Sequence, residues 1–170
     1  MHETQTGVRV ELAREGSANV ATGLPVLDHL IGELAAAARF KLSLEVAPES
    51  ADESVAAAGR ALGEALAERI AANAGSGWAL APAAEALASA ALERDLQARF
   101  VTNVDFSDQR VGGLATDVAA RFLDALAIAA GLNLHVRLVE GTDPQHVLSA
   151  IFKAVGAALG QACRPAPADA

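Results

Sequence analysis

The sequence contains a single cysteine, Cys163, among its 170 residues. One cysteine excludes an internal disulfide and suits a protein of the reducing cytoplasm. Aromatic residues make up only 4% of the chain, so no stacking platform for bases is visible. Basic residues are also outnumbered: 13 lysines and arginines stand against 21 acidic residues, which gives a net charge of −8. Because nucleic-acid backbones require a basic face, this balance argues against a nucleic-acid partner.

Long apolar runs are missing as well. No run reaches the roughly 18 residues that a membrane-spanning helix needs. The first residues, Met1–Gln5, are polar and do not resemble a signal peptide. We therefore expect a cytoplasmic protein with no membrane partner. Hydrophobic residues nevertheless make up 52% of the chain, enough for one domain or for two small halves that share a core.

Hydrophobic periodicity predicts a similar order of elements twice. In the first half we expect two strands, a helix, a strand and a helix at residues 8–12, 18–22, 25–38, 42–46 and 54–72. In the second half we expect a strand, a turn, a helix, a strand and a helix at residues 100–106, 108–113, 116–130, 132–138 and 144–162. Ser54 and Thr116 are candidate N-caps, and Pro25 and Pro144 fit the starts of their helices.

The two halves also match residue by residue. Segment 52–63 aligns with segment 145–156, and Leu42 aligns with Leu134. These matches predict an internally duplicated α/β (α+β) fold, in which each half is a small sheet with two helices and the helices pack between the sheets. The halves are expected at about residues 1–87 and 88–170. Each is close to the lower size limit for a stable core, so we expect a single domain over residues 1–170.

Four stretches resemble motifs of the imidazoleglycerol-phosphate dehydratase family. They are Thr22–Leu30 (TGLPVLDHL), which is similar to TGIGFFDHM; Asn103–Phe106 with Arg110–Gly113; Ala130–Val136 (AGLNLHV), which is similar to AGINLHI; and Gly141–His146 with Ala150–Ala154, which is similar to GxNxHHxxEAxFKA. The likeness runs through nearly the whole chain in order and would also explain the internal repeat. The chain is identified as a divergent member of this family.

The resemblance implies a hydro-lyase of histidine biosynthesis that removes water from imidazole glycerol phosphate. It also implies two manganese ions bound between the subunits of a 24-subunit shell, with the metals acting as Lewis acids. We therefore expect self-association, with trimers as a building block or a larger shell as the product.

Three histidines stand at the family's metal-ligand positions, but both HHxxE motifs have changed, to Asp52–Ala56 (DESVA) and Gln145–Ser149 (QHVLS). By family geometry, the first ligand set is His29, Glu53 and His146. Two imidazoles and one carboxylate form a recognisable set for a divalent metal.

The second ligand set implied by the resemblance is Asp52, His135 and Gln145, which is weaker because it has only one imidazole. We therefore expect one divalent ion, manganese by resemblance, or none. For the substrate phosphate, the resemblance leaves a single ligand, Lys153. A dianion usually needs several charge-assisted hydrogen bonds, and one lysine supplies few. The sequence assigns no catalytic residue.

Each of these residues also has an ordinary structural interpretation. Asp52 and Glu53 suit the start of a helix because of its dipole, His135 suits the polar side of a surface strand, and Lys153 suits a solvated helix face. Three hypotheses stay open: a dehydratase-like protein of histidine biosynthesis with weak or no activity, so that its status as an enzyme is uncertain; a non-catalytic structural homologue that assembles alone or with an active paralogue; and a binding module for a single divalent metal.

Overall fold

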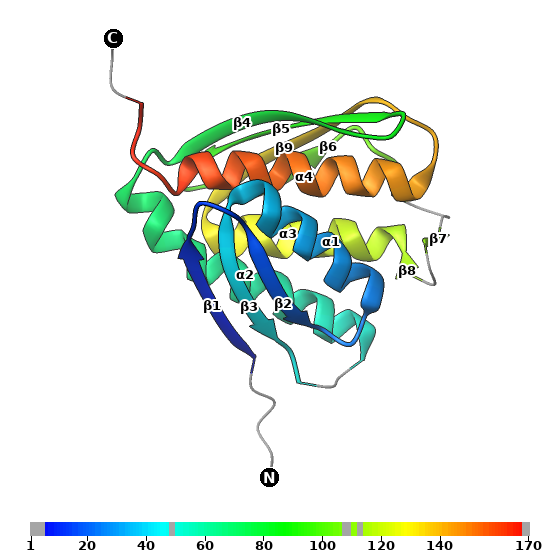
Figure 1. The fold of residues 1–170 in the computed structure, drawn as a ribbon, viewed down its shortest axis with the longest axis horizontal. Coiled ribbons are helices and arrows are strands. Elements are labelled where there is room, and N and C mark those ends of the chain that lie inside the picture. Colours follow the sequence, from blue (N-terminus) through cyan, green and yellow to red (C-terminus); the bar gives the residue numbers. More distant parts are fainter. Residues whose placement is uncertain (1–5, 48–49, 107–109, 112–113, 168–170) are drawn as a thin grey trace.

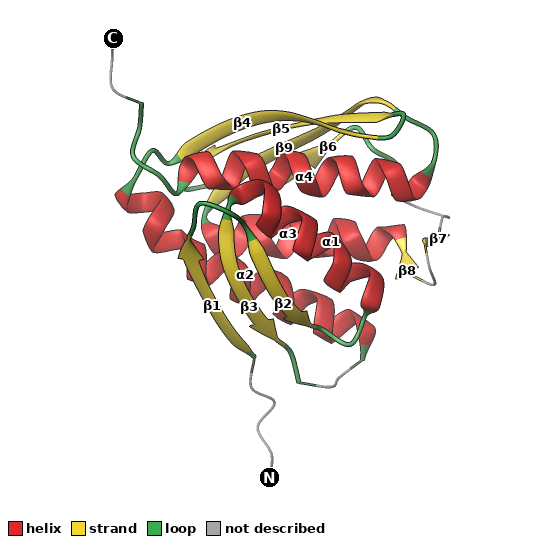
Figure 2. Ribbon diagram, viewed as in Figure 1, coloured by secondary structure: helices red, strands yellow, loops and turns green. Residues whose placement is uncertain are grey.

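The computed structural model describes residues 6–47, 50–106, 110–111 and 114–167. In the described residues, four helices lie between the three-stranded and the four-stranded sheet, and Figure 1 and Figure 2 show this layered arrangement. The elements are β1 (Gly7–Leu12), β2 (Ser17–Ala21), α1 (Pro25–Ala38), β3 (Phe40–Glu45), α2 (Ala51–Ala72), β4 (Ser76–Ala83), β5 (Ala86–Arg94), β6 (Arg99–Thr102), β7 (Arg110–Val111), β8 (Leu114–Ala115), α3 (Thr116–Ala130), β9 (Leu132–Glu140) and α4 (Pro144–Ala162). None of these helices is long and apolar enough to cross a membrane.

The two sheets repeat one strand arrangement. The first sheet has the order β1-β3-β2 and the second has the order β4-β5-β9-β6. β3 pairs antiparallel with β1 and parallel with β2, and β9 pairs in the same way with β5 and β6. Leu42 of β3 lies opposite Val10, and its counterpart Leu134 of β9 lies opposite Leu92. The predicted duplicated α/β fold, with helices between two sheets, is confirmed.

The helices pack as two equivalent pairs that each cross between the halves. α1 packs on α4, and α2 packs on α3. A glycine allows the close approach in each pair: a Cβ atom on Gly156 would lie 2.2 Å from the carbonyl oxygen of Leu34, and one on Gly63 would lie 2.7 Å from that of Leu126. Gly63 corresponds to Gly156 in the repeat, and Leu34 corresponds to Leu126.

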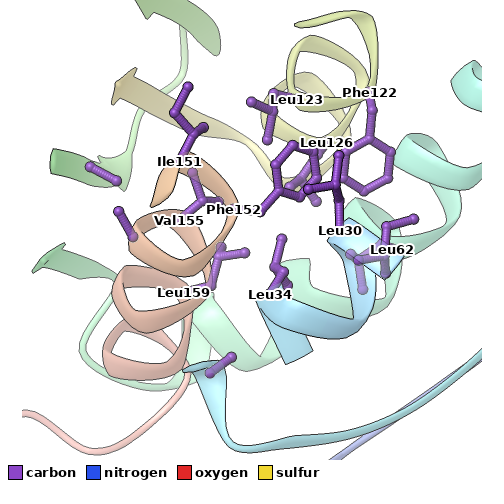
Figure 3. Packing of buried hydrophobic residues seen from close by; sticks show 14 of the residues in the cluster. Leu30, Leu34, Leu62, Phe122, Leu123, Leu126, Ile151, Phe152, Val155 and Leu159 are labelled. Carbon is purple, nitrogen blue, oxygen red and sulfur yellow. The ribbon is translucent and has the colours of Figure 1, made fainter. Parts of the chain in front are cut away.

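Aromatic side chains fill the middle of the helix layer. The rings of Phe122 from α3 and Phe152 from α4 stack with their centroids 5.7 Å apart and their planes 20° apart. Both side chains are fully buried among leucines and other aliphatic residues of the layer (Figure 3). Such a pair stabilises the fold through apolar burial and through ring contact.

In the first sheet, β3 lies between β1 and β2, although β1 and β2 are consecutive in the chain. Both predicted N-caps were wrong. α2 begins earlier than expected and its N-cap is Ser50, whereas Ser54 is buried within the helix. Thr116 is not an N-cap either; it is the first residue of α3, and its hydroxyl donates a hydrogen bond to the carbonyl oxygen of Phe106.

The segment between the two halves also differs from the expectation. The hairpin of β4 and β5 was not predicted, and β6 covers only the start of the strand expected at 100–106. The expected turn at 108–113 falls largely outside the described residues. The division of the chain between residues 87 and 88 stays a prediction, and that position lies within β5.

Candidate metal and phosphate site

All four helices of the central layer begin at the same end of the molecule, on the right in Figure 1. Five candidate residues lie near these helix starts: His29 in α1, Asp52 and Glu53 in α2, and Gln145 and His146 in α4. Helix N-termini carry a partial positive charge, so a cation here would depend on side chains to hold it.

His29 lies on α1 just after a turn that its neighbour Asp28 stabilises. The Asp28 carboxylate accepts a hydrogen bond from the backbone N–H of Thr22, six residues earlier, at 2.9 Å. The turn includes Gly23, whose φ of 85° is in the region that favours glycine. Asp28 therefore secures the entry to α1 from within the helix, and the N-cap position belongs to Leu24.

The imidazole of His29 is paired within its own helix. Its Nε2 atom lies 2.7 Å from Oε1 of Glu33, one turn further along α1. The same carboxylate oxygen accepts a hydrogen bond from the hydroxyl of Ser149 on α4 at 3.0 Å. Sequence reasoning did not single out Glu33, although its spacing of four residues from His29 is one at which helical side chains meet.

The imidazole of His146 is held by a residue from a hairpin of the second sheet, on which α4 packs. Its Nδ1 atom lies 2.6 Å from Oε2 of Glu85, at the tip of the β4–β5 hairpin. Glu85 also accepts a hydrogen bond from the backbone N–H of Asp143 at 3.0 Å. Hydrogen bonds from the backbone N–H groups of Asp143 and of Glu85 itself, with the nearby His146, lower the pKa of Glu85 to about 2. Glu85 is therefore a carboxylate over the working pH range.

The carboxylate of Asp52 is occupied by an arginine. Oδ1 of Asp52 lies 2.6 Å from Nη1 of Arg121 on α3, and Nη2 of the same guanidinium lies 3.3 Å from Oδ2 of Asp117. All three side chains are about half exposed or more. The second candidate ligand set thus contains a fixed cation beside its only carboxylate.

Glu53 has a local structural role at the start of α2. Its backbone N–H donates to the hydroxyl oxygen of Ser50 at 3.3 Å, and the same hydroxyl donates to Oε2 of Glu53 at 3.0 Å. Ser50 and Glu53 occupy the N-cap and N3 positions of the capping-box sequence, and the Ser50 hydroxyl satisfies one backbone N–H of the helix N-terminus.

His135 lies away from the helix starts. It is on β9, on the exposed outer face of the second sheet, between Ala91 of β5 and Val101 of β6. Within the described residues its side chain forms no hydrogen bond or ion pair, which fits the surface interpretation.

Lys153, the candidate phosphate ligand, contacts the edge of the second sheet. Its Nζ atom lies 3.4 Å from the carbonyl oxygen of Pro82 on β4. Further along the same edge, the side-chain amide of Gln161 accepts a hydrogen bond from the N–H of Trp78 and donates one to its carbonyl oxygen. The two α4 side chains therefore cover the unpaired edge of β4, where free backbone groups would otherwise invite further strands.

The candidate ligands do not converge in one chain. Over the described residues, no group of three or more His, Cys, Asp and Glu side chains could hold a metal ion. Neither the set of His29, Glu53 and His146 nor the set of Asp52, His135 and Gln145 is therefore assembled within a single copy.

Comparison with known proteins identifies the family of this chain. The sequence profile of the imidazoleglycerol-phosphate dehydratase family matches residues 22–159, a range that includes every candidate residue. The chain belongs to this family. The family links it to histidine biosynthesis and to lyase chemistry. An imidazoleglycerol-phosphate dehydratase of Desulfitobacterium hafniense is 36% identical over 97% of this chain and 87% of its own length. One of Pelobacter propionicus is 33% identical over 97% of this chain and 88% of its own.

Solved structures of the family have the same architecture. The imidazoleglycerol-phosphate dehydratase of Staphylococcus aureus superposes with a TM-score of 0.85 at 25% identity and covers 95% of both chains. The enzyme of Pyrococcus furiosus, at 22% identity, shares the fold with a TM-score of 0.82 over 98% of this chain and 93% of its own.

The family resemblance implies two metal ions, and the two candidate ligand sets are not equally suited to bind them. The second set does not fit a divalent ion, because the carboxylate of Asp52 is neutralised by Arg121 and an amide such as Gln145 is a weak neutral ligand. In the first set, both histidines have one ring nitrogen beside a carboxylate, which leaves the other nitrogen for a metal: Nδ1 of His29 and Nε2 of His146. Glu53 is engaged with Ser50 at the start of its own helix.

Proposed function

We propose that this chain is an imidazoleglycerol-phosphate dehydratase-like protein of histidine biosynthesis with little or no dehydratase activity, and that it acts mainly as a structural subunit. The observation that supports this proposal is the 2.6 Å ion pair between Arg121 and Asp52. A guanidinium stays charged in proteins, and it repels a divalent ion from the carboxylate that it occupies. A mechanism that needs two metals is disfavoured when one ligand set carries its own cation in this way.

The remaining candidate ligands can bind at most one divalent ion per chain. With manganese we expect weak binding that mild chelation removes and that His146→Ala abolishes. Asp52→Asn should leave this binding unchanged, because Asp52 is already committed to Arg121. Elemental analysis that finds two tightly held ions per chain would contradict the proposal.

The structural role that we propose includes self-association in the cytoplasm, into trimers or a larger shell, alone or with an active paralogue. Strand pairing places Trp78, Ala91, His135 and Val101 side by side across the outer face of the second sheet. Trp78 is 59% exposed and Val101 is 42% exposed, and Leu80 adds a further exposed side chain on β4. Apolar patches of this kind are commonly covered in an assembly. Light scattering that shows a monomer at micromolar concentration would exclude self-association and leave only assembly with a paralogue.

Complementation tests the proposal most directly. A histidine auxotroph that lacks its dehydratase would receive this chain or, as a control, the Desulfitobacterium hafniense relative. We expect growth without histidine only with the control. Purified chain with added manganese should likewise turn over imidazole glycerol phosphate very slowly or not at all. Growth at the control rate would show that substitute ligands are sufficient for this chemistry.

A module that binds a single metal is the second candidate. The observation that favours it is the orientation of His146 by Glu85, which is the arrangement common among metal-binding histidines. Specific manganese binding without dehydration would separate this candidate from a purely structural subunit.

A further inference from the structure

Glu85 joins two elements that are remote in sequence. It follows Ala84, whose φ of 50° lies in the left-handed region, at the tip of the β4–β5 hairpin. One carboxylate oxygen of Glu85 receives the N–H of Asp143, and the other contacts the ring of His146, 61 residues further along the chain. The carboxylate therefore bridges the backbone of the α4 cap and an imidazole in its first turn.

The backbone around this bridge is closely packed. A Cβ atom on Gly141, at the end of β9, would lie 2.7 Å from the Cβ atom of Ala86 at the start of β5. Asp143 in turn accepts hydrogen bonds from the N–H groups of Gln145 and His146 at 2.9 and 3.3 Å. The relative placement of Glu85 and His146 is thus fixed by the backbone as well as by their own contact.

The bridge decides which nitrogen of His146 carries the proton. Nδ1 lies 2.6 Å from Glu85, whereas the nearest oxygen of Asp143 is 3.9 Å away, beyond hydrogen-bond distance. An ionised carboxylate only accepts hydrogen bonds, so the ring nitrogen that faces it must donate. In the neutral ring the lone pair is then on Nε2.

We propose that Glu85 is a positioning residue that fixes His146 in the Nδ1–H tautomer and presents Nε2 as a ligand for a divalent metal ion. The metal part of this inference rests on the proposed single-metal capacity of the chain, but the tautomer does not. His29 is held differently, because its Nε2 atom is the one that contacts a carboxylate. His135 makes no such contact within the described residues, so it serves as an internal reference.

Nitrogen NMR of the histidine rings tests the tautomer without metal or substrate. At a pH where the rings are neutral, we expect His146 of the wild-type chain to carry its proton on Nδ1. Glu85→Ala should shift it toward the tautomer mixture that His135 shows, and His135 itself should not change. The control Glu140→Ala removes another exposed carboxylate, at the end of β9, and should leave His146 as it is.

Paramagnetic broadening by Mn²⁺ tests the ligand role. We expect Mn²⁺ to broaden the His146 ring signals at lower concentration than those of His135, and Glu85→Ala to weaken this effect about 10-fold or more. A wild-type His146 with its proton on Nε2, or a tautomer that Glu85→Ala leaves unchanged, would overturn the inference; the wild-type spectrum decides even if the variant does not fold. Because the first measurement uses neither metal nor substrate, dehydratase activity in the wild-type chain would refute the proposed function and leave this test intact.

Discussion

The α1/α4 pair and the α2/α3 pair are equivalent halves of one repeat, yet their N-terminal ends carry different chemistry. His29 of α1 corresponds to Arg121 of α3, and His146 of α4 corresponds to Glu53 of α2. At the first pair, two imidazoles are each held by a carboxylate. At the second pair, a guanidinium neutralises the carboxylate of Asp52. The N-terminal end of the α1/α4 pair has candidate metal ligands, whereas that of the α2/α3 pair has the guanidinium of Arg121 in their place.

The interiors of the two pairs differ much less. Gly63 and Gly156 each meet a carbonyl oxygen of the facing helix, at Leu126 and Leu34. These contacts lie in the packed layer, where a change of one methyl group is felt. The helix ends are partly exposed and tolerate a change of chemistry. The comparison shows that the close helix contacts at these glycines are kept in both pairs while the side chains at the helix starts differ, so function must be argued from those side chains.

The largest expected effect concerns a place where the interiors differ in size. Phe122 and Phe152 stack between the pairs, and their counterparts in the repeat are Leu30 and Gly59. Phe152→Ala should lower the free energy of unfolding by about 3–5 kcal/mol, because it empties a fully buried site. Urea denaturation measures this loss. If Leu30→Ala costs as much as Phe152→Ala, the aromatic stack is not a special link between the pairs.

The next effect tests whether the two helix crossings are equally tight. Gly156→Ala would bring a methyl group to within 2.2 Å of a carbonyl oxygen, whereas Gly63→Ala would bring it to within 2.7 Å. Both should destabilise, by about 1–3 kcal/mol, with Gly156→Ala the more costly. Gly32→Ala on α1 is the matched control, since no atom lies within 4 Å of the added carbon. It should be neutral or stabilising by up to ~1 kcal/mol, because alanine favours helix. Equal losses for all three variants would mean that helix approach is not the cause.

A smaller effect separates the C-terminal ends of the two pairs. Cys163, just after α4, corresponds to Ile70 of α2, and both are fully buried. Burial raises the pKa of the Cys163 thiol from 9.0 to about 11. The raised pKa belongs to the folded state, which therefore favours the neutral thiol. Below pH 9 the thiol is neutral in both states and the folded state keeps its full stability. As the pH rises from 9 toward 11, only the unfolded state ionises and the free energy of unfolding falls. By pH 10 the wild-type chain should lose roughly 1 kcal/mol more than Cys163→Val. Parallel denaturation curves at pH 8 and pH 10 measure this difference, and identical losses would contradict it.

The sequence predicted the elements with a clear apolar pattern and missed those built on alanine. α1 was predicted at residues 25–38 and lies there, because Pro25 marks its start and leucines repeat along one face. β4 and β5 were missed because buried positions such as Ala79, Ala81 and Ala90 are alanines, which do not favour strands. β4 pairs with β5, and β5 pairs with β9, so the sheet forms only when strands that are distant in the sequence come together.

The sequence predicted which residues belong to the candidate site, but it did not predict which side chains contact them. The resemblance pointed to His29, His146 and Asp52, but their partners could not be inferred from it. Arg121 is 69 residues from Asp52, and Glu85 is 61 residues from His146. Only folding brings such groups together, so a sequence pattern contains no sign of them. The Glu33 contact alone was within reach, through its helical spacing.

The smallest expected effect comes from a variant that makes the N-terminal end of the α2/α3 pair resemble that of the α1/α4 pair. Arg121→His places an imidazole on α3 at the position where α1 has His29. Without metal, the loss of the ion pair should cost at most ~1 kcal/mol, because Arg121, Asp52 and Asp117 are all partly exposed and screened by water. With the guanidinium gone, Asp52 and Asp117 are free to bind a divalent ion, and a ligand that binds only the folded state raises stability. We therefore expect Mn²⁺ to raise the Tm of Arg121→His more than that of the wild-type chain, and the second substitution Asp52→Asn to remove the gain. If Mn²⁺ raised the wild-type Tm equally, and Asp52→Asn removed that rise, a metal would already bind beside Arg121 and the two ends would not differ in the way described.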